Sequence, residues 1–372
     1  MKLLSIFPEE FTGHFAREYH VYRLADSLAA AGCDVTLAAA PSDKITTHDQ
    51  LHDLFGGSRN ERLKIIWLKR RLSLGPLKIR SGGWFFRQLD RVIAELKPDA
   101  VYTMHVKAAR HLGKRHPSLP LIFEAHEIFA DTYPENSAKH RQLLKTEHEI
   151  YARARGVVAI SSYLAESLQK RFGVGVPIRV QHDGIDEAML LDPATTPDPH
   201  ELIYTGSLQP WKGVPVAIAA MRLLPEFHLT VIGGSEKSLD DLRRDAPANV
   251  TFLGQMPREA LRPALQRASI GLMPNLLEPR SALYTFPLKL LEYSAAGKGI
   301  VASQIPAFDQ LNLGWVDLVP SGSAEALAAA VRSLGKRGID RAAGQAWAAQ
   351  FLWKNQGLAM HSFLQSVLKP IA

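Results

Sequence analysis

The chain has 372 residues, 46% of them hydrophobic and 22% charged, which is typical of a globular protein of about two domains and excludes a mostly disordered or fibrous chain. Its formal charge of +7 points to anionic partners. The single cysteine, Cys33, excludes an internal disulfide, and no Cys/His grouping has zinc spacing. The apolar run at 2–7 is too short for a signal peptide, and no stretch is long enough to span a bilayer. We therefore expect a cytoplasmic protein.

The N-terminal segment has the pattern of a β-loop-α-β unit. Residues 2–7 form a short apolar run, residues 15–31 have helical periodicity and stop at Gly32, and residues 34–40 form the next strand candidate. Further strand candidates, each followed by a helical pattern, are 100–104, 121–124 and 156–160. Parallel strands joined by crossover helices predict a layered α/β domain.

The same pattern starts again about 200 residues later. Residues 202–204 form a strand, 206–213 a loop, 214–224 a helix and 227–232 a strand that ends at Gly233. The strand candidates that follow are 249–253, 270–273 and 299–302. The sequence thus predicts two α/β domains that face each other, with a proline-rich linker near 183–199 and a final helix over 345–368 that is rich in aromatic residues.

A basic segment lies within the first half. Between Arg59 and Arg91 ten Lys or Arg residues stand against two acids, with Trp67 and the run 84–86 interleaved. A solvated charged face, nucleic-acid binding and adhesion to anionic lipid are the three interpretations. No nucleic-acid recognition motif accompanies the segment, so we expect no nucleic-acid partner, whereas Lys/Arg with interfacial Trp suits a lipid surface.

Two segments of the second half carry anion-binding and sugar-binding chemistry. Lys212 lies between a predicted strand and helix, where a cation and the helix amides can bind phosphate together. Pro287 suits the first turn of a helix that Thr285 would cap and Gly297 would end. Glu292 lies one and a half turns inside this helix, where a partly buried carboxylate can accept hydrogen bonds from sugar hydroxyls.

The first half offers a histidine at the end of a strand. His126 follows the predicted strand 121–124 and could donate to a substrate hydroxyl or transfer a proton; the alternative is a structural histidine. Neither His126-Glu127 nor His148-Glu149 completes a zinc-protease motif. Gly13, in the first loop, is either a simple turn residue or a point of close approach to a ligand.

These segments together resemble the family 4 glycosyltransferases, retaining enzymes of the GT-B fold. The resemblance lies in YTGS at 204–207 with WKG at 211–213, in FPLKLLEY at 286–293, in EAHE at 124–127 and in QHDGID at 181–186. It implies that Lys212 contacts the donor diphosphate, that Glu292 holds the nucleotide ribose, and that His126 orients sugar hydroxyls. The set that we expect to contact the donor is Gly13, Gly206, Ser207, Lys212, Gly233, Arg280, Thr285, Phe286, Pro287, Leu288, Lys289 and Glu292.

The chain departs from the family pattern at two positions. Tyr284 stands where the family often has a second glutamate, and Ser207 replaces an arginine common after the first glycine of the loop. Arg280 or Lys289 would then have to supply the missing phosphate-neutralising cation.

The resemblance also implies a domain plan and a reaction. It gives an acceptor-binding Rossmann-like domain at 1–182, a hinge at 183–200, a donor-binding domain at 201–345 across a cleft, and a helix at 346–372 that packs back on the first domain. The expected reaction moves a sugar from a nucleotide-diphosphate sugar to a sugar or lipid-linked acceptor with retention, without a metal or cofactor, at the inner membrane face where the segment 59–91 contacts anionic lipid. The alternatives are a GT-B sugar-nucleotide epimerase or phosphorylase, and a non-catalytic sugar-nucleotide or nucleic-acid binding protein.

Overall fold

A computed structural model describes residues 1–13, 15–74, 77–80, 82–190, 195–256, 258–278, 286, 288–308, 311 and 313–369. The chain divides into two compact units. The first unit contains Met1–Asp183 and Trp353–Ala372, and the second contains Gly184–Leu352. Most of the segment interpreted as a linker thus belongs, by its contacts, with the second unit.

The first unit is built on a seven-stranded sheet in the order β3-β2-β1-β6-β7-β8-β9. All neighbouring strands in it are parallel. The strands are β1 (Lys2–Glu10), β2 (Asp34–Ala40), β3 (Leu63–Trp67), β6 (Ala100–Thr103), β7 (Leu121–Ala125), β8 (Gly156–Ala159) and β9 (Ile178–Val180). A separate antiparallel pair, β4 (Arg71–Leu74) and β5 (Leu77–Arg80), lies between β3 and the next helix in the chain.

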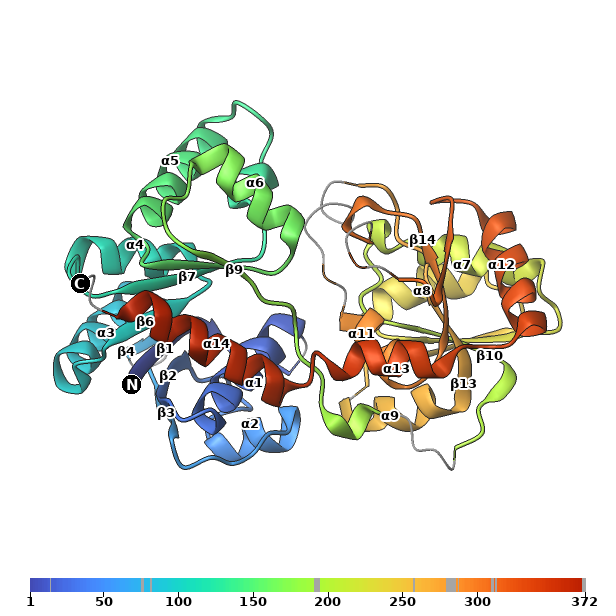
Figure 1. Cartoon of the computed structure of the whole chain (residues 1–372), viewed down its shortest axis with the longest axis horizontal. Coiled ribbons are helices and arrows are strands. Elements are labelled where there is room, and N and C mark those ends of the chain that lie inside the picture. Colours follow the sequence, from blue (N-terminus) through green and yellow to red (C-terminus); the bar gives the residue numbers. More distant parts are fainter. Residues whose placement is uncertain are drawn as a thin grey trace. The chain divides into compact units, whose positions relative to one another are not determined.

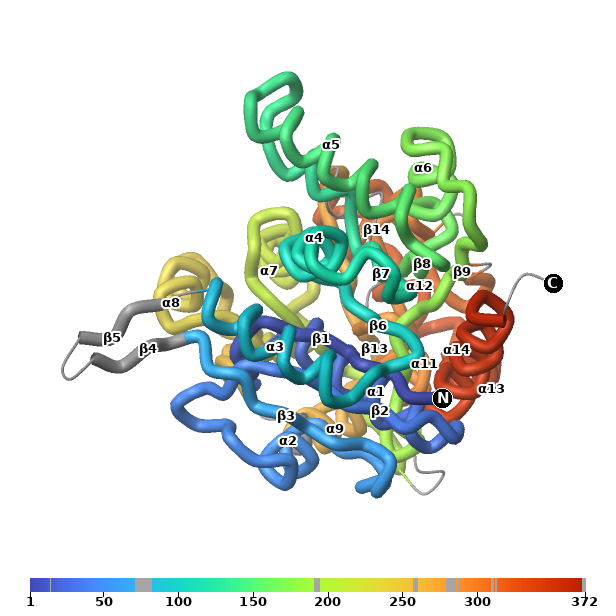
Figure 2. Tube along the Cα trace, turned by 90° about the vertical axis from the view of Figure 1, so that its left-hand side faces the viewer, coloured from blue at the N-terminus to red at the C-terminus, as the bar shows by residue number. Residues whose placement is uncertain are grey.

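Helices cover both faces of this sheet (Figures 1 and 2). They are α1 (Ala16–Ala30), α2 (His48–Phe55), α3 (Gly82–Leu96), α4 (Val106–Arg115), α5 (Ala138–Arg153), α6 (Ser162–Phe172) and α14 (Trp353–Leu368), with the short 3-10 helix η1 (Phe129–Thr132). The C-terminal helix α14 packs along α1 so closely that a Cβ on Gly357 would lie 2.4 Å from the Ser27 carbonyl oxygen. The last helix therefore belongs to the first unit, as the predicted fold requires.

The second unit repeats the design on a six-stranded sheet in the order β12-β11-β10-β13-β14-β15, again entirely parallel. Its strands are β10 (Asp198–Thr205), β11 (His228–Ile232), β12 (Val250–Gly254), β13 (Ala268–Met273), β14 (Gly299–Ser303) and β15 (Val316–Val319). Its helices are α7 (Val214–Arg222), α8 (Glu236–Arg244), α9 (Arg258–Arg267), α11 (Leu288–Ala295), α12 (Ala324–Arg337) and α13 (Arg341–Ala349), with the short helices η2 (Glu187–Met189), η3 (Pro210–Lys212) and η4 (Pro306–Phe308). Two buried apolar clusters join helices to this sheet.

The strand order reverses at the same place in both sheets. The first strand of each unit lies centrally, and the chain then crosses to its other side, between β1 and β6 and between β10 and β13. In open parallel sheets ligands bind at the carboxyl ends of the strands beside such a reversal. The prediction of two Rossmann-like α/β units is confirmed, and the structure marks one candidate crevice in each.

One predicted element is wrong in detail. The helix expected over 345–368 is two helices, α13 and α14, interrupted at residues 350–352. The interruption falls where the chain passes from the second unit to the first. No helix in the described part of the chain is both long enough and apolar enough to cross a membrane.

Candidate functional site

The crevice of the second unit begins with the loop that carries Lys212. This lysine ends η3, directly after β10, and Gly213 follows in a left-handed conformation with φ of 67°. A Cβ on Gly213 would lie 1.8 Å from the Pro274 carbonyl oxygen, so only glycine fits. The Leu276 amide also donates to the Trp211 carbonyl at 2.9 Å. The lysine loop is thereby fixed against the segment that follows β13.

The backbone is equally crowded at the ends of β10 and β11. The Gly206 amide donates to the Ile232 carbonyl at 2.9 Å, and a Cβ on Gly233, whose φ is 121°, would lie 2.1 Å from the Gly206 carbonyl oxygen. Ser207 is exposed, and its carbonyl accepts a hydrogen bond from the Tyr204 hydroxyl at 2.7 Å. The predicted glycines thus keep side chains out of this corner of the sheet, which leaves backbone there for a ligand to approach.

Lys289 projects toward the same corner from α11. It is buried, its Nζ lies 3.9 Å from the centroid of the Tyr204 ring, and a Cβ on Gly206 would lie 3.4 Å from that Nζ. The ammonium donates no hydrogen bond to any described residue. Burial, followed by the charge of Lys212, holds the pKa of Lys289 well below its usual range, while Glu292 opposes the shift. Burial also lowers the pKa of Lys212.

The helix α11 is fixed by the side chain next to Glu292. The Tyr293 hydroxyl accepts the Thr205 amide at 2.8 Å, and the Tyr293 ring fills the space above Gly271. Glu292 is itself buried, and it lies three residues after Lys289, so the two side chains project from neighbouring positions of the helix. The structure therefore brings Lys212, Lys289 and Glu292 to the end of β10, a site with two lysine side chains and one carboxylate.

The remaining residues of the predicted donor set contribute less or fall outside the described residues. The Phe286 ring packs in the core, 5.7 Å from the Phe351 ring, and Leu288 is half-buried against the same cluster. Gly297 has φ of 60° and ends the helix as expected. The predicted contacts of Arg280, Thr285 and Pro287 lie outside the part of the chain that the structure describes.

The crevice of the first unit contains the predicted histidine and a buried polar chain behind it. His126 follows β7, and its Nε2 lies 3.2 Å from Oε1 of Glu124, the buried fourth residue of that strand. The same oxygen lies 2.6 Å from Nε2 of His20 on α1. Nδ1 of His20 lies 2.6 Å from the Asp183 carboxylate. His126 is 27% exposed, whereas His20 and Glu124 are almost fully buried. This series of polar contacts therefore leads from the surface at His126 into the interior.

The charges and hydrogen bonds of these groups strongly shift each other's pKa values. Burial by itself would lower the pKa of His20, but the charge of Glu124 and the hydrogen bond with Asp183 raise it to about 10. Burial would raise the pKa of Glu124, but the charges of His20 and His126 hold it well below its usual range. At neutral pH the buried His20 is therefore an imidazolium between two carboxylates, and Glu124 is ionised beneath His126.

Gly13 has the left-handed conformation of a turn glycine, with φ of 84°. Its amide donates to the buried Glu18 carboxylate at 2.7 Å, and the Thr12 amide and hydroxyl donate to the same carboxylate at 2.8 Å. Glu18 thus fixes the first loop from α1. The Gly13 amide is already used, which favours the turn interpretation over a direct ligand contact.

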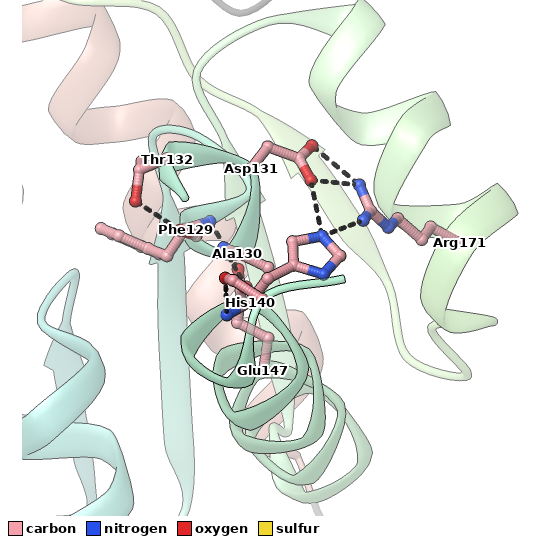
Figure 3. A network of polar contacts seen from close by, with 8 residues as sticks. Phe129, Ala130, Asp131, Thr132, His140, Glu147 and Arg171 are labelled. Atoms are coloured by element: carbon pink, nitrogen blue, oxygen red, sulfur yellow. Dashed lines mark hydrogen bonds and ion pairs between the residues drawn. The ribbon is translucent and has the colours of Figure 1, made fainter. Parts of the chain in front are cut away.

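The segment after His126 is held by a second buried carboxylate, Glu147 on α5 (Figure 3). Its two oxygens accept the backbone amides of Phe129 and Ala130, each at 2.9 Å. Next to them Asp131 forms a bidentate ion pair with Arg171 at 2.7 Å. Burial raises the pKa of Glu147 to about 7, although the two amides oppose the shift. The loop that carries His126 is therefore bounded by two buried acids.

The sequence predicts His126 but not the residues behind it. His20 lies in an apolar helical pattern, and Asp183 belongs to the hinge motif with no other feature to mark it. The two are 163 residues apart in sequence, so no local spacing relates them. The one local signal was Glu124, a charged residue inside an otherwise apolar strand.

Models of two protein families match the chain: "Glycosyltransferase Family 4" over residues 18–188 and "Glycosyl transferases group 1" over residues 199–337. The chain is 28% identical to glycogen synthase of Mycobacterium tuberculosis, across 96% of this chain and 93% of that protein. It is 24% identical to phosphatidyl-myo-inositol mannosyltransferase of Mycolicibacterium smegmatis, across 89% and 84%. Anabaena HepE in complex with UDP-glucose has a TM-score of 0.72 at 18% identity, with 98% of this chain and 100% of that chain covered.

Three findings agree on the class of this protein: the two Rossmann-like units, the family match in each of them, and relatives of similar length. The chain is a glycosyltransferase, and its fold is GT-B. The predictions of the GT-B fold and of a glycosyl-transferring enzyme are confirmed.

Proposed function

We propose that this glycosyltransferase belongs to family 4 and transfers a sugar, with retention of its anomeric configuration, from a nucleotide-diphosphate sugar to an acceptor in polysaccharide assembly. The observation that carries the proposal is the pair Lys212 and Lys289 beside Glu292 at the end of β10. A nucleotide-diphosphate sugar offers both complements, a diphosphate for the cations and ribose hydroxyls for the carboxylate. The HepE structure, which contains UDP-glucose, supports this class of donor.

The two lysines would act on the leaving group. As the sugar–phosphate bond breaks, negative charge grows on the diphosphate, and cations already in place stabilise that charge without reorganising. One such contact contributes about 3 kcal/mol, or roughly a hundredfold in rate. Lys289 would supply the second cation that Ser207 lacks, and with two ammonium groups we propose that the donor chemistry needs no metal. Glu292 would hold the ribose through bonds of about 1.5–3 kcal/mol.

His126 would orient a sugar hydroxyl in the first unit. Glu124 lies behind it at 3.2 Å and fixes the imidazole from the buried side. The exposed part of the ring is then free to face a sugar. Both this role and retention of configuration would follow from membership of family 4, which the family match over residues 18–188 supports.

A lipid-linked acceptor at an anionic membrane surface is the second part of the proposal. The mannosyltransferase relative, whose name specifies a phosphatidyl-inositol acceptor, supports it. Within 59–91 the exposed cations include Lys64, Lys69, Arg87 and Arg91, while Arg59 and Arg62 form ion pairs with nearby aspartates.

The aromatic residues of this segment differ in exposure. Phe85 is buried and the half-buried Phe86 ring stacks on His111 with 4.6 Å between ring centroids, whereas Trp67 and Trp84, the tryptophans of the membrane hypothesis, are half-buried. Adhesion through the basic residues should be sensitive to salt. Co-sedimentation with phosphatidylserine vesicles tests it, and equal binding to neutral vesicles would contradict it.

The donor site is tested by thermal unfolding with UDP-, GDP-, ADP- and dTDP-sugars in the presence of a chelator. A nucleotide sugar at a hundred times its dissociation constant should stabilise the protein by about 2.7 kcal/mol. We expect the shift for one base, its loss in Lys289→Met and Glu292→Ala, and its retention in Lys336→Met, which removes an exposed lysine of α12. No shift with any donor, or an equal shift in Lys289→Met, would contradict the proposal. NMR of the product then reports the anomeric configuration.

A further inference from the structure

At the strand-order reversal of the first unit, two polar side chains face each other without forming a hydrogen bond. Glu9 lies near the end of β1, and His105 lies two residues after β6, the strand beside it. Oε1 of Glu9 is 3.9 Å from Nε2 of His105, which exceeds hydrogen-bond distance. Ligands of open parallel sheets bind at the carboxyl ends of the strands beside such a reversal, so the pair lies where a substrate is expected.

The hydrogen-bonding role of His105 is fixed by the helix that follows it. Its Nδ1 accepts the Ala108 amide at 3.3 Å and caps α4, so Nδ1 carries no proton and Nε2 is the donor. Burial, followed by the charges of Lys107 and of two arginines, lowers the pKa of His105 to about 4. The imidazole is therefore neutral, and its contact with Glu9 is not an ion pair.

A helix cap alone does not require histidine. Among the described helices, α2, α5, α6, α12 and α13 are capped by a Thr, Ser or Asp side chain that accepts the amide three residues on. His105 does the same and adds an N–H on the far side of its ring. Its own amide donates to the Thr103 hydroxyl at 3.1 Å, and that hydroxyl donates to the Ile6 carbonyl at 2.9 Å. The Nε2–H group is thereby held in place relative to β1, which carries Glu9.

Glu9 is oriented through its other oxygen. Its Oε2 forms an ion pair with the Arg17 guanidinium at 2.7 Å, and that guanidinium also lies 4.9 Å from the centroid of the Phe15 ring. Arg17 thus occupies Oε2, while Oε1 lies toward His105. The side chains of Glu9 and His105 are 32% and 25% exposed, so a ligand can reach both.

A group that both donates and accepts hydrogen bonds matches this pair. A carboxylate oxygen only accepts, and the protonated Nε2 of a neutral imidazole only donates. A hydroxyl can donate to Glu9 while it accepts from His105, whereas an ionised phosphate has no proton to donate and an ammonium has no lone pair to accept with. The spacing also suits a hydroxyl, because an oxygen about 2.8 Å from each atom would have an angle of about 90° between the two bonds.

We propose that Glu9 and His105 together bind one hydroxyl of the acceptor, which therefore presents a polyol, such as a sugar or cyclitol ring, to the first unit. This inference deepens the proposed function and rests on it, because it takes the first unit to receive the acceptor. The strand β6 lies between β1 and β7. His126, which follows β7, would then contact a second hydroxyl of the same ring.

Saturation-transfer NMR of the full chain tests the pair, with myo-inositol and the methyl glycosides of glucose, galactose and mannose as probes and inorganic phosphate as competitor. We expect at least one polyol to bind and phosphate not to displace it. Glu9→Gln should weaken that binding by about 10- to 100-fold, because it removes a charged acceptor, and His105→Asn by about tenfold. Asn keeps the cap of α4. His116→Asn, at the other end of α4, is the matched control and should bind like the wild type.

The double variant tests whether one hydroxyl is shared. If both groups bind the same hydroxyl, the two losses are not additive, so Glu9→Gln combined with His105→Asn should bind about as weakly as Glu9→Gln alone. Losses that multiply would overturn the shared hydroxyl.

Three results would overturn the proposal as a whole: displacement of the polyol by phosphate, polyol binding that survives both single variants, and an equal loss in His116→Asn. These measurements use no nucleotide sugar. Polyol binding without a thermal shift from any nucleotide sugar would contradict the proposed donor site and leave the pair intact. A nucleotide-sugar shift without binding of any polyol would overturn the pair alone.

Discussion

Replacing Glu147 with glutamine tests how the structure holds the segment after His126. The carboxylate is fully buried and accepts two backbone amides, yet its pKa is raised to about 7 from 4.5, chiefly by burial. The folded protein therefore keeps this proton at a pH where the unfolded chain has released it. The stabilising contribution is complete below pH 4.5 and is lost as the pH rises through 7.

The size of this effect follows from the two pKa values. A pKa near 7 against 4.5 corresponds to about 3 kcal/mol of unfolding free energy over the whole titration, of which about 2 kcal/mol falls between pH 5 and pH 8. Glutamine resembles the protonated acid in shape and charge but does not titrate. We therefore expect Glu147→Gln to match the wild type near pH 5 and to be more stable by about 2 kcal/mol at pH 8.

Hydrogen exchange in urea, read by mass spectrometry, is the appropriate assay because it follows peptides of the first unit separately from those of the second. Glu149→Gln is the matched control, since Glu149 lies on the same helix and is exposed. Parallel pH profiles for wild type and Glu147→Gln would refute the reasoning. So would an equal divergence in Glu149→Gln, which would attribute the pH dependence to net charge.

Three further predictions concern the packing around the two sites. Lys289→Met removes a buried lysine whose Nζ has no hydrogen-bond acceptor among the described residues. The free energy of unfolding of the free protein, measured in urea, should therefore rise by about 1 kcal/mol or more while nucleotide binding is lost. An unchanged free energy of unfolding would contradict this. Gly213→Ala should cost at least about 2 kcal/mol, because φ is 67° and a carbonyl oxygen lies 1.8 Å from the new Cβ, whereas Gly314→Ala, with open space around it, should be neutral in the same assay. Trp353→Phe deletes a buried 2.8 Å hydrogen bond to the Tyr19 hydroxyl and should lower the melting temperature by the equivalent of about 1 kcal/mol.

Most of the strands that the sequence predicted lie in the middle of the two sheets, although the predicted β12 is an edge strand. A strand that is covered on both faces has a continuous run of apolar residues, which can be recognised in the sequence, as in β1, β6, β13 and β14. The strands β3 and β15 were not predicted. Each lies at a sheet edge and pairs with a single neighbour, so each includes exposed or half-buried polar residues and resembles a loop in the sequence.

The site residues that the sequence predicts are likewise those marked by a local pattern, and those that depend on distant parts of the chain are missed. Lys212 and Glu292 could be proposed because each lies in a short segment whose own pattern, strand to loop to helix, places it at a strand end. His20 could not, because its role depends on α1 lying over β7, which only the complete strand order establishes. The break between α13 and α14 was missed for a related reason: the chain changes units there while its helical pattern continues.

The two sites differ in how the described protein compensates their buried charges. In the second unit Lys289 is a buried lysine that donates no hydrogen bond to any described residue and is repelled by Lys212. In the first unit Glu124 pairs with His20 and His126, and His20 also pairs with Asp183. A buried cation that lacks such partners destabilises a fold unless a ligand supplies the missing charge, and for that reason such groups concentrate at functional sites. The expected gain in stability on removing Lys289, together with lost nucleotide binding, is the direct consequence, because one ammonium group causes both effects.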